Sequence, residues 1–293
     1  MNGMHYEGNH IIRPPSEARS ILLQVTVGCS HNKCIFCPTY KGVKFKIKPD
    51  EIILKDIEYA ANYYFNVRRL FLMDGDALII PQKKLVWILE TINKKLPLVE
   101  RIGIYANAKA IKRKSLEELK ELRDLKLGII YYGIESGNDE VLKFVKKGTS
   151  SSELIEQGKK VIEAGIKLSC TVLLGIAPRG LSFSHAVDTG NVLTKIDPDY
   201  ASALTVMIVP GTELYNMVKE GKFKPYNQKE LLEELKVMLE NTNMTHGLFT
   251  SNHASNYLPL KVKLPEDKKK ALNMIELALK GEVPLREEWM RAL

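Results

Sequence analysis

Three cysteines that lie within nine residues are the part of this sequence best suited to chemistry. Cys29, Cys34 and Cys37 stand in the polar segment GCSHNKCIFC, residues 28–37. Such close spacing, with one further cysteine in the chain, favours metal binding over a disulfide framework. Thiolates bind iron–sulfur clusters, and three of them ligate only three of the four irons of a [4Fe–4S] cluster. The fourth iron is then open to a ligand from outside the protein.

Two other interpretations of the cysteines stay open. Zinc usually takes four ligands, so His31 would have to be the fourth. Its position between Cys29 and Cys34 makes it an awkward ligand for the same ion. The cysteines could also be ordinary core residues, which the polar, loop-like character of the segment disfavours.

Polar residues follow three apolar runs further along the chain. The segment Asp74-Gly75-Asp76 follows residues 69–73, Asn107 follows 101–106, and Glu135-Ser136 follows 127–134. Glycine permits close backbone approach, and carbonyls or carboxylates accept hydrogen bonds from an ammonium group. A carboxylate can also accept from ribose hydroxyls or from a substrate. The plainer interpretations are an acidic turn for residues 74–76 and a helix cap or salt bridge for Glu135.

Alternating strands and helices would position these residues. The pattern predicts strands at 20–27, 69–73, 101–106, 127–134, 167–174 and 200–209, with helices at 49–65, 81–95, 115–125, 152–164 and 183–196. Pro49 begins the first helix, Ser115 and Glu118 form a capping box, and Gly165 ends the helix at 152–164. Six strand-then-helix units predict parallel strands with helical crossovers.

We therefore predict an α/β fold, a partial (β/α)6 TIM-like barrel whose active site lies at the carboxyl ends of the strands. After residue 211 the pattern gives a helix at 228–241, an irregular stretch at 244–259 and a helix at 265–280. The expected organisation is an N-terminal segment at 1–19, a barrel core at 20–220 and a C-terminal extension at 221–293 that closes the barrel. A doubly wound open sheet is the alternative.

Composition narrows the class of protein. No apolar run approaches the roughly 20 residues needed to span a bilayer, and the N-terminus has no signal pattern, so we expect a cytoplasmic protein without a membrane partner. The net charge is +8, but lysines alternate with glutamates along the helices, as on a solvated surface. A nucleic-acid partner is therefore disfavoured without being excluded, and an acidic substrate or electron donor fits the charge.

The cysteine segment resembles the cluster loop of the radical S-adenosylmethionine (SAM) superfamily, with Phe36 before the last cysteine. The commonest spacing there is CxxxCxxC, and this chain has one residue more between its first two cysteines. Four further segments resemble the family in the same order: 73–77 its Gly-Gly-Glu turn, 133–142 its GxESGxxxxL segment, 171–176 its strand beside adenine, and 207–215 its Pro-Gly-Thr-x-Leu-Tyr ending. The resemblance covers residues 18–220 and is nearest to the Elp3, MiaB and coproporphyrinogen-oxidase-like branch.

This resemblance implies a [4Fe–4S] cluster on Cys29, Cys34 and Cys37 that cleaves SAM reductively to a 5′-deoxyadenosyl radical. The radical would abstract hydrogen from a small or anionic substrate, with a flavodoxin or ferredoxin-type protein as electron donor. The residues implied in binding SAM are Phe36, Asp74, Gly75, Asp76, Asn107, Glu135, Ser136, Leu174 and Val209.

Two features lie outside those segments. Cys170 is the one remaining cysteine, and we expect a small buried hydrophobe, with a hydrogen-atom donor as the alternative. A second cluster is therefore not expected, which argues against a methylthiotransferase, and we expect no cobalamin or TRAM domain. The polar and aromatic stretch at 249–259 is a candidate cover for the substrate, with His253, Asn256 and Tyr257 as its candidate contacts and Glu135 as a further catalytic candidate.

Two other classes of function compete with a radical enzyme. One is an iron–sulfur electron-transfer or cluster-carrier protein without SAM chemistry, although a ferredoxin-like carrier needs four cysteines for each cluster. The other is a basic RNA-binding protein with a structural metal, for which the sequence has no recognisable RNA-binding motif.

Overall fold

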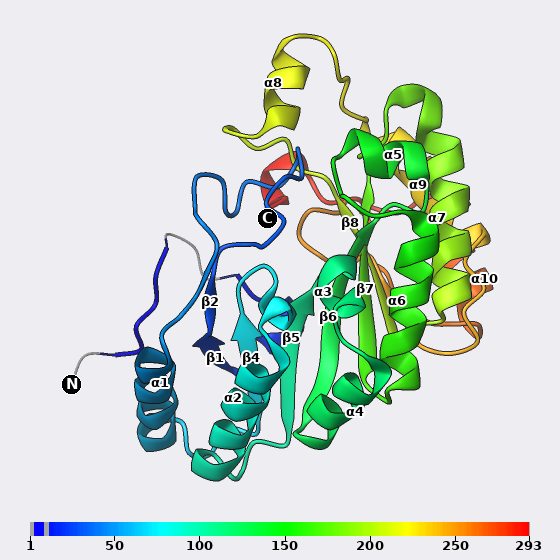
Figure 1. The fold of residues 1–293 in the computed structure, drawn as a ribbon. Helices are drawn as coiled ribbons and strands as arrows, with labels where there is room; N and C mark the ends of the chain where they lie inside the picture. The colour runs from blue at the N-terminus through cyan, green and yellow to red at the C-terminus, as the bar shows by residue number, and fades with distance from the viewer. Residues whose placement is uncertain (1–2, 9–11, 293) are drawn as a thin grey trace. The chain divides into compact units, whose positions relative to one another are not determined.

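The computed structural model of the protein describes residues 3–8 and 12–292. Within these residues an eight-stranded sheet has the order β1-β4-β5-β6-β7-β8-β9-β10 (Figure 1). The strands are β1 Ile21–Gln24, β4 Arg69–Met73, β5 Arg101–Ala106, β6 Leu127–Glu135, β7 Lys167–Leu174, β8 Tyr200–Thr205, β9 Leu248–Thr250 and β10 Lys261–Lys263. The strand order follows the chain order without the reversal of a doubly wound sheet. The predicted α/β partial barrel is therefore confirmed.

The chain divides into two compact units. The first holds residues 1–32, 39–132 and 160–168, and the second holds residues 33–38, 133–159 and 169–293. The predicted division at residues 20 and 221 stays a prediction, and residues 1–2 and 9–11 of its first segment lie outside the described part of the chain.

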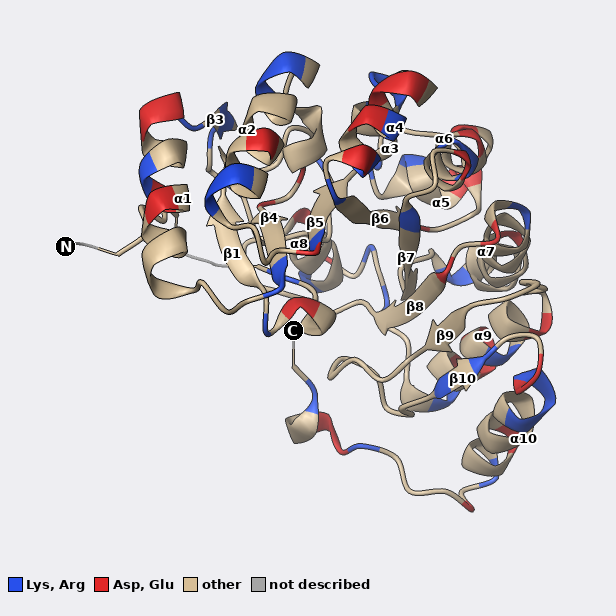
Figure 2. Ribbon diagram, turned by 90° about the horizontal axis from the view of Figure 1, so that it is seen from below, with Lys and Arg blue, Asp and Glu red and all other residues tan. Residues whose placement is uncertain are grey.

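In the first unit, β1, β4 and β5 are consecutive parallel neighbours. The helices are α1 Asp50–Tyr63, α2 Gln82–Lys95, α3 Ala108–Lys112 and α4 Leu116–Asp124. Helix α1 buries Ile53, Ile57 and Ala60, whose spacing of four and three residues puts them on one face. Charged residues lie mainly on the helices, while β4 and β5 carry few (Figure 2). The predicted capping box of Ser115 and Glu118 is present.

The predicted strand at 20–27 is in fact two strands. Residues Ile21–Gln24 pair with β4, whereas Thr26–Val27 (β2) turns away and pairs antiparallel with Lys46–Ile47 (β3). Periodicity did not show this break because both parts are buried. The segment between β2 and β3 is residues 28–45, which we call the cysteine loop. The two-stranded ribbon closes the base of this loop.

In the second unit, β7, β8 and β9 are parallel and β10 is antiparallel to β9. The helices are α5 Asp139–Phe144, α6 Ser151–Glu163, α7 Ser182–Ile196, α8 Glu213–Lys219, α9 Gln228–Glu240 and α10 Lys268–Leu279. Helices α7, α9 and α10 pack beside one another (Figure 1). Gly190 allows the close approach of α7 to α9, because a Cβ there would lie 2.6 Å from the carbonyl oxygen of Met238.

The C-terminal extension contributes two short strands to the sheet. Residues 244–259 were expected to be irregular, but Leu248–Thr250 forms β9 and pairs with β8. A three-residue strand is too short to show alternation, which is why the sequence pattern missed it. The predicted strand at 200–209 ends at Thr205. In the described part of the chain, no helix is long and apolar enough to span a bilayer.

Candidate functional site

The three cysteines of the cysteine loop are half-buried, and none of them forms a disulfide. Cys29 belongs to the first unit, and Cys34 and Cys37 belong to the second. Half-buried thiols in a loop that follows the first strand suit an iron–sulfur cluster, which needs thiolate ligands and partial exclusion of water. The fourth cysteine, Cys170, is fully buried on β7, and burial raises the pKa of its thiol.

The turn after β4 holds the first cysteine. We call residues Asp74–Asp76 the acidic turn. The backbone N–H of Gly75 donates to the carbonyl of Gly28 over 3.2 Å. A Cβ at position 75 would lie 2.8 Å from the Cβ of Cys29 and 3.3 Å from its sulfur. Only glycine therefore fits here with Cys29 in its present place.

The carboxylate of Asp74 is used inside the first unit. Its Oδ2 accepts from the backbone N–H of Gly28 over 3.0 Å and from Nε2 of Gln24 over 3.0 Å, and its Oδ1 accepts from the hydroxyl of Tyr40 over 3.4 Å. The residue is 1% exposed and has a φ of 78°. Burial raises the pKa of Asp74, although these hydrogen bonds act in the opposite direction.

Asp76 and Asn107 lie together. The amide nitrogen of Asn107 donates to Oδ2 of Asp76 over 2.7 Å, and the hydroxyl of Ser30 donates to the same oxygen. Asn107 also begins α3, because its Oδ1 accepts from the N–H of Ala110. These two predicted SAM contacts thus fix the ends of β4 and β5 relative to the residue after Cys29.

In the second unit, the segment around Cys34 and Cys37 is anchored at Ile35. The N–H of Ile35 donates to the carbonyl of Val145, and its carbonyl accepts from the N–H of Leu214 at the start of α8. Ile35 and Phe36 pack into an apolar cluster with α5 and α8. Thr212 begins α8, and its hydroxyl donates to the carbonyl of Val209. The Pro-Gly-Thr segment therefore supports the cysteine loop.

Glu135 ends β6 with a φ of 65°. Its Oε1 accepts from the ammonium of Lys147 over 2.8 Å, and the two side chains are 12% and 9% exposed. Such a paired and nearly buried carboxylate is held in one orientation.

Ser136 and Gly137 pack against α7. The Ser136 hydroxyl is bonded to Nδ1 of His185 over 2.8 Å. A Cβ at Gly137 would lie 2.3 Å from the carbonyl oxygen of Asp188. Ser136 is fully buried, so its hydroxyl serves the packing of β6 on α7.

Sequence reasoning missed a buried polar pair, His185 and Glu234. Oε1 of Glu234 accepts from the N–H of Gly175, just after Leu174, over 2.6 Å and lies 3.7 Å from Nε2 of His185. Burial lowers the pKa of His185, and its Nε2 is bonded to the carbonyl of Leu173. The signal was the position of Glu234 among the buried leucines of α9.

The stretch at 249–259 is tied to the end of β8. The amide of Asn256 donates to the carbonyls of Ala203 and Ser251 and accepts from Thr205 Oγ1, each over 2.8 Å. Its polar atoms therefore serve the fold. Nδ1 of His253 is bonded to Ser255 Oγ, and burial lowers the pKa of His253.

Residues 286–291, near the C-terminus, bind this stretch. The guanidinium of Arg286 donates to the carbonyls of His253, Asn256 and Asn252 over 2.6, 3.2 and 3.3 Å. The guanidinium of Arg291 lies over the ring of Tyr257, 4.1 Å from its centroid, and the Tyr257 hydroxyl donates to Glu288. Burial raises the pKa of Tyr257. A substrate contact stays a prediction for His253, Asn256 and Tyr257.

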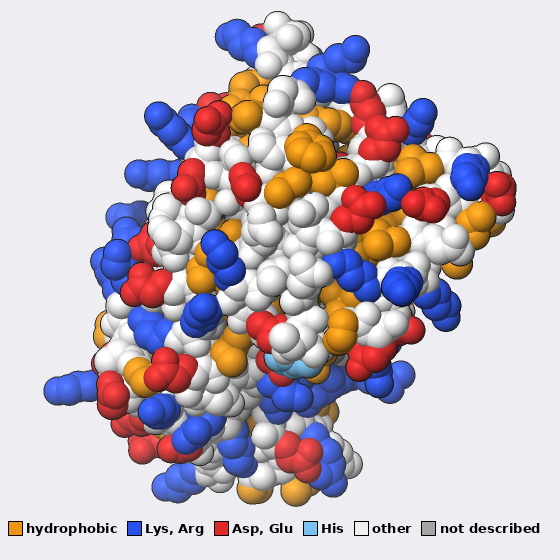
Figure 3. Space-filling view, turned by 90° about the vertical axis from the view of Figure 1, so that its right-hand side faces the viewer, with side chains coloured by type: hydrophobic (Ala, Val, Ile, Leu, Met, Phe, Trp, Pro, Cys, Tyr) orange, Lys and Arg blue, Asp and Glu red, His pale blue; other side chains and the backbone are white. Residues whose placement is uncertain are grey.

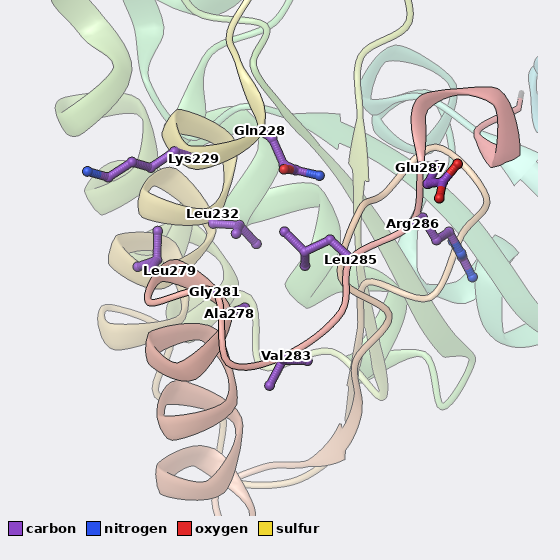
Figure 4. A pocket seen from close by; sticks show the side chains of 10 residues that line it. All are labelled: Gln228, Lys229, Leu232, Ala278, Leu279, Gly281, Val283, Leu285, Arg286 and Glu287. Atoms are coloured by element: carbon purple, nitrogen blue, oxygen red, sulfur yellow. The ribbon is translucent and has the colours of Figure 1, made fainter.

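One cavity of about 410 Å³ lies where the C-terminal segment passes α9 and α10 (Figure 4). Leu232, Leu279, Val283 and Leu285 form its apolar wall, and none of the predicted site residues lines it. Figure 3 shows one face of the molecule on which basic and acidic side chains are interspersed. The net charge is therefore not gathered into a basic patch on that face.

The fold and the sequence define a partial-barrel protein with three cysteines in the loop that follows its first strand. The model of the Radical SAM superfamily matches residues 23–189, more than half of the chain. The protein therefore belongs to the radical SAM superfamily of enzymes. Membership implies a [4Fe–4S] cluster and SAM, and such enzymes need a reductant.

The relatives are distant. An uncharacterised protein of Methanocaldococcus jannaschii is 24% identical over 224 residues, 72% of this chain and 68% of the relative. The tRNA uridine(34) acetyltransferase of Methanocaldococcus infernus is 24% identical over 249 residues, 70% of this chain and 46% of that protein. This chain thus spans less than half the length of the acetyltransferase.

A solved structure confirms the fold. Coproporphyrinogen III oxidase from Escherichia coli, a radical SAM enzyme, superposes with a TM-score of 0.56 at 14% identity, over 76% of this chain and 53% of that chain. At this identity the similarity supports the fold alone, and that fold agrees with the predicted partial barrel.

Proposed function

We propose that Cys29, Cys34 and Cys37 hold one [4Fe–4S] cluster and that the protein cleaves SAM to methionine and a 5′-deoxyadenosyl radical, which abstracts hydrogen from a substrate. The observation that carries this proposal is the close fit of Cys29 against Gly75. A Cβ at position 75 would lie only 2.8 Å from the Cβ of Cys29. The cluster, when bound, supplies the electron that breaks a carbon–sulfur bond of SAM.

The chain's own residues would bind and orient SAM. Because the Asp74 carboxylate already accepts three hydrogen bonds, the acidic turn offers backbone carbonyls to the SAM ammonium. Glu135, oriented by Lys147, would accept from the ribose hydroxyls. Ser136, bonded to His185, would anchor the residue after Glu135 on α7.

The remaining contacts are apolar or lie beside these groups. Phe36, Leu174 and Val209 would flank the adenine. Asn107, which lies beside Asp76, would add a contact to the ribose. His253 and Tyr257 would face a small or anionic substrate. Apolar walls around the adenine exclude the water that would otherwise quench a radical.

The electron donor is proposed to be an acidic flavodoxin or ferredoxin-type protein. Lys33, Lys41 and Lys44 are exposed side chains of the cysteine loop itself. Opposite charge on a donor would speed its encounter with this loop and make the rate fall as salt is added.

The test is anaerobic reconstitution. The parent should bind about four irons per chain, as one [4Fe–4S] cluster requires, and with dithionite should convert SAM to methionine and 5′-deoxyadenosine, followed by mass spectrometry. Replacing Cys29, Cys34 and Cys37 together by alanine should abolish both. Cys170→Ala is the matched control and should keep both.

Two outcomes would contradict the proposal. A full cluster in the triple variant would move the site elsewhere. A four-iron protein that leaves SAM intact under reduction would favour the alternative, an iron–sulfur carrier or electron-transfer protein.

A further inference from the structure

Each residue of the acidic turn contacts one residue at the start of the cysteine loop. Asp74 accepts from the N–H of Gly28, Gly75 leaves the space that Cys29 fills, and Asp76 accepts from the hydroxyl of Ser30. The two carboxylates thus bind the residues on either side of Cys29, and the glycine between them faces the cysteine.

We infer that Asp74 is a positioning residue that fixes Cys29 in place before any cluster is bound. This inference rests on the proposed function, because it concerns the ligand of the proposed cluster. Asp74 was predicted from the sequence as a SAM contact. Its 1% exposure and its three donors assign its side chain to the loop instead.

Asp74 also connects the two ends of the cysteine loop. Its Oδ2 holds Gly28 at the start, and its Oδ1 accepts from Tyr40 after the last cysteine. The Tyr40 ring is itself packed against Gly75, where a Cβ would lie 2.8 Å from its Cε2. One carboxylate therefore closes the loop from both sides.

Other bonds of the first unit complete this closure. The amide of Asn32 donates to the carbonyl of Tyr40 over 2.7 Å. Gln24, which donates to Asp74, also exchanges two hydrogen bonds with the backbone of Glu7, at 2.7 and 2.8 Å. None of these bonds involves a cluster ligand's sulfur, so the base of the loop is closed by the protein alone.

The chemistry of position 74 suggests a sharp test. In Asp74→Ala the buried N–H of Gly28 and the amide of Gln24 lose their acceptor, which a buried donor tolerates poorly. In Asp74→Asn the amide oxygen can accept from both, and its NH2 can donate to the Tyr40 hydroxyl. Asparagine also tolerates the positive φ of 78° at this position. The two variants therefore separate hydrogen bonding from charge.

The first measurement is hydrogen–deuterium exchange of the iron-free protein. We expect the parent and Asp74→Asn to protect the amides of residues 28–32, and Asp74→Ala to lose that protection while protection in α9 is unchanged. The second is the rate at which a chelator strips iron from the reconstituted protein. Loss should be about ten- to hundredfold faster in Asp74→Ala, as for other supports of metal ligands, and within about twofold of the parent in Asp74→Asn.

The matched control is Asp124→Ala, which removes an exposed carboxylate of α4 and should behave as the parent in both measurements. Tyr40→Phe is the second variant in case Asp74→Ala does not fold. It removes the donor at the far end of the loop, and should speed exchange at residues 39–43.

Three results would overturn the inference: parental protection of residues 28–32 in Asp74→Ala, parental exchange in Tyr40→Phe, or an Asp74→Asn variant as labile as Asp74→Ala. Failure of the proposed function can be told apart from failure of this inference. Hydrogen–deuterium exchange measures the protection of the loop even in a parent protein that never binds iron.

Discussion

At the scale of single residues, Asp74 and Asn256 each bind protein groups through both ends of their polar side chains. The sequence shows that a carboxylate follows a strand, but not whether φ is positive or which donors face it. Glu135 differs, because its Oε1 accepts from a charged side chain, the ammonium of Lys147.

Glu135 should matter for SAM and not for iron. In Glu135→Ala the lost charge-assisted hydrogen bond should raise the dissociation constant for SAM about tenfold or more, with the iron content unchanged. Equilibrium dialysis of SAM against the reconstituted protein measures this. Glu140→Ala, an exposed residue of α5, is the control, and unaltered SAM binding by Glu135→Ala would place the ribose contact elsewhere.

At the scale of elements, prediction from sequence worked best where a strand is a long buried run. The bounds of β4, β5 and β7 match the predicted ranges to the residue, because buried parallel strands read as continuous apolar segments. It failed at β9, which is three residues long. It also missed the pairing of Glu234 with His185, because the periodicity of α9 places Glu234 beside buried leucines but carries no trace of a partner on α7.

The His185 pair should make stability depend on pH. Burial lowers the pKa of His185, so below its usual pKa of about 6.5 the unfolded chain binds a proton that the folded chain does not. Stability should therefore fall as the pH falls from 7.5 to 5.5, by at most about 1.4 kcal/mol per pH unit for this group. Urea unfolding of the iron-free protein at several pH values measures the slope.

His185→Gln should flatten that slope while lowering stability at pH 7.5, because the bonds to Ser136 and Leu173 are altered. The control is His246→Gln, at an exposed histidine, which should keep the parental slope. Equal slopes in parent and His185→Gln would mean that other groups carry the pH dependence.

At the scale of the whole molecule, the end of the described chain supports the stretch at 249–259. Arg286 alone binds three of its carbonyls. This support joins residues that lie 30, 33 and 34 positions apart in the sequence. Local sequence patterns carry no trace of such contacts, so the support of residues 249–259 by Arg286 was not predictable.

Arg286→Ala should loosen this stretch. Loss of hydrogen bonds from a charged donor should lower the free energy of unfolding by about 2 kcal/mol and should expose residues 250–259 to limited proteolysis, with iron content unchanged. Mass spectrometry of the fragments locates the cut. Arg113→Ala, at an exposed arginine, is the control, and a fragment pattern like that of the parent would show that the tether is not needed.

The closed base of the cysteine loop has a consequence for the protein's life without iron. In proteins whose metal site forms only on binding, removing the metal unfolds the chain. Here a ribbon of β2 and β3, together with Asp74 and Asn32, encloses the loop through bonds that need no iron. Without the proposed cluster the chain should therefore remain folded during iron scarcity, escape degradation as an unfolded protein, and take up the cluster when iron returns without new synthesis.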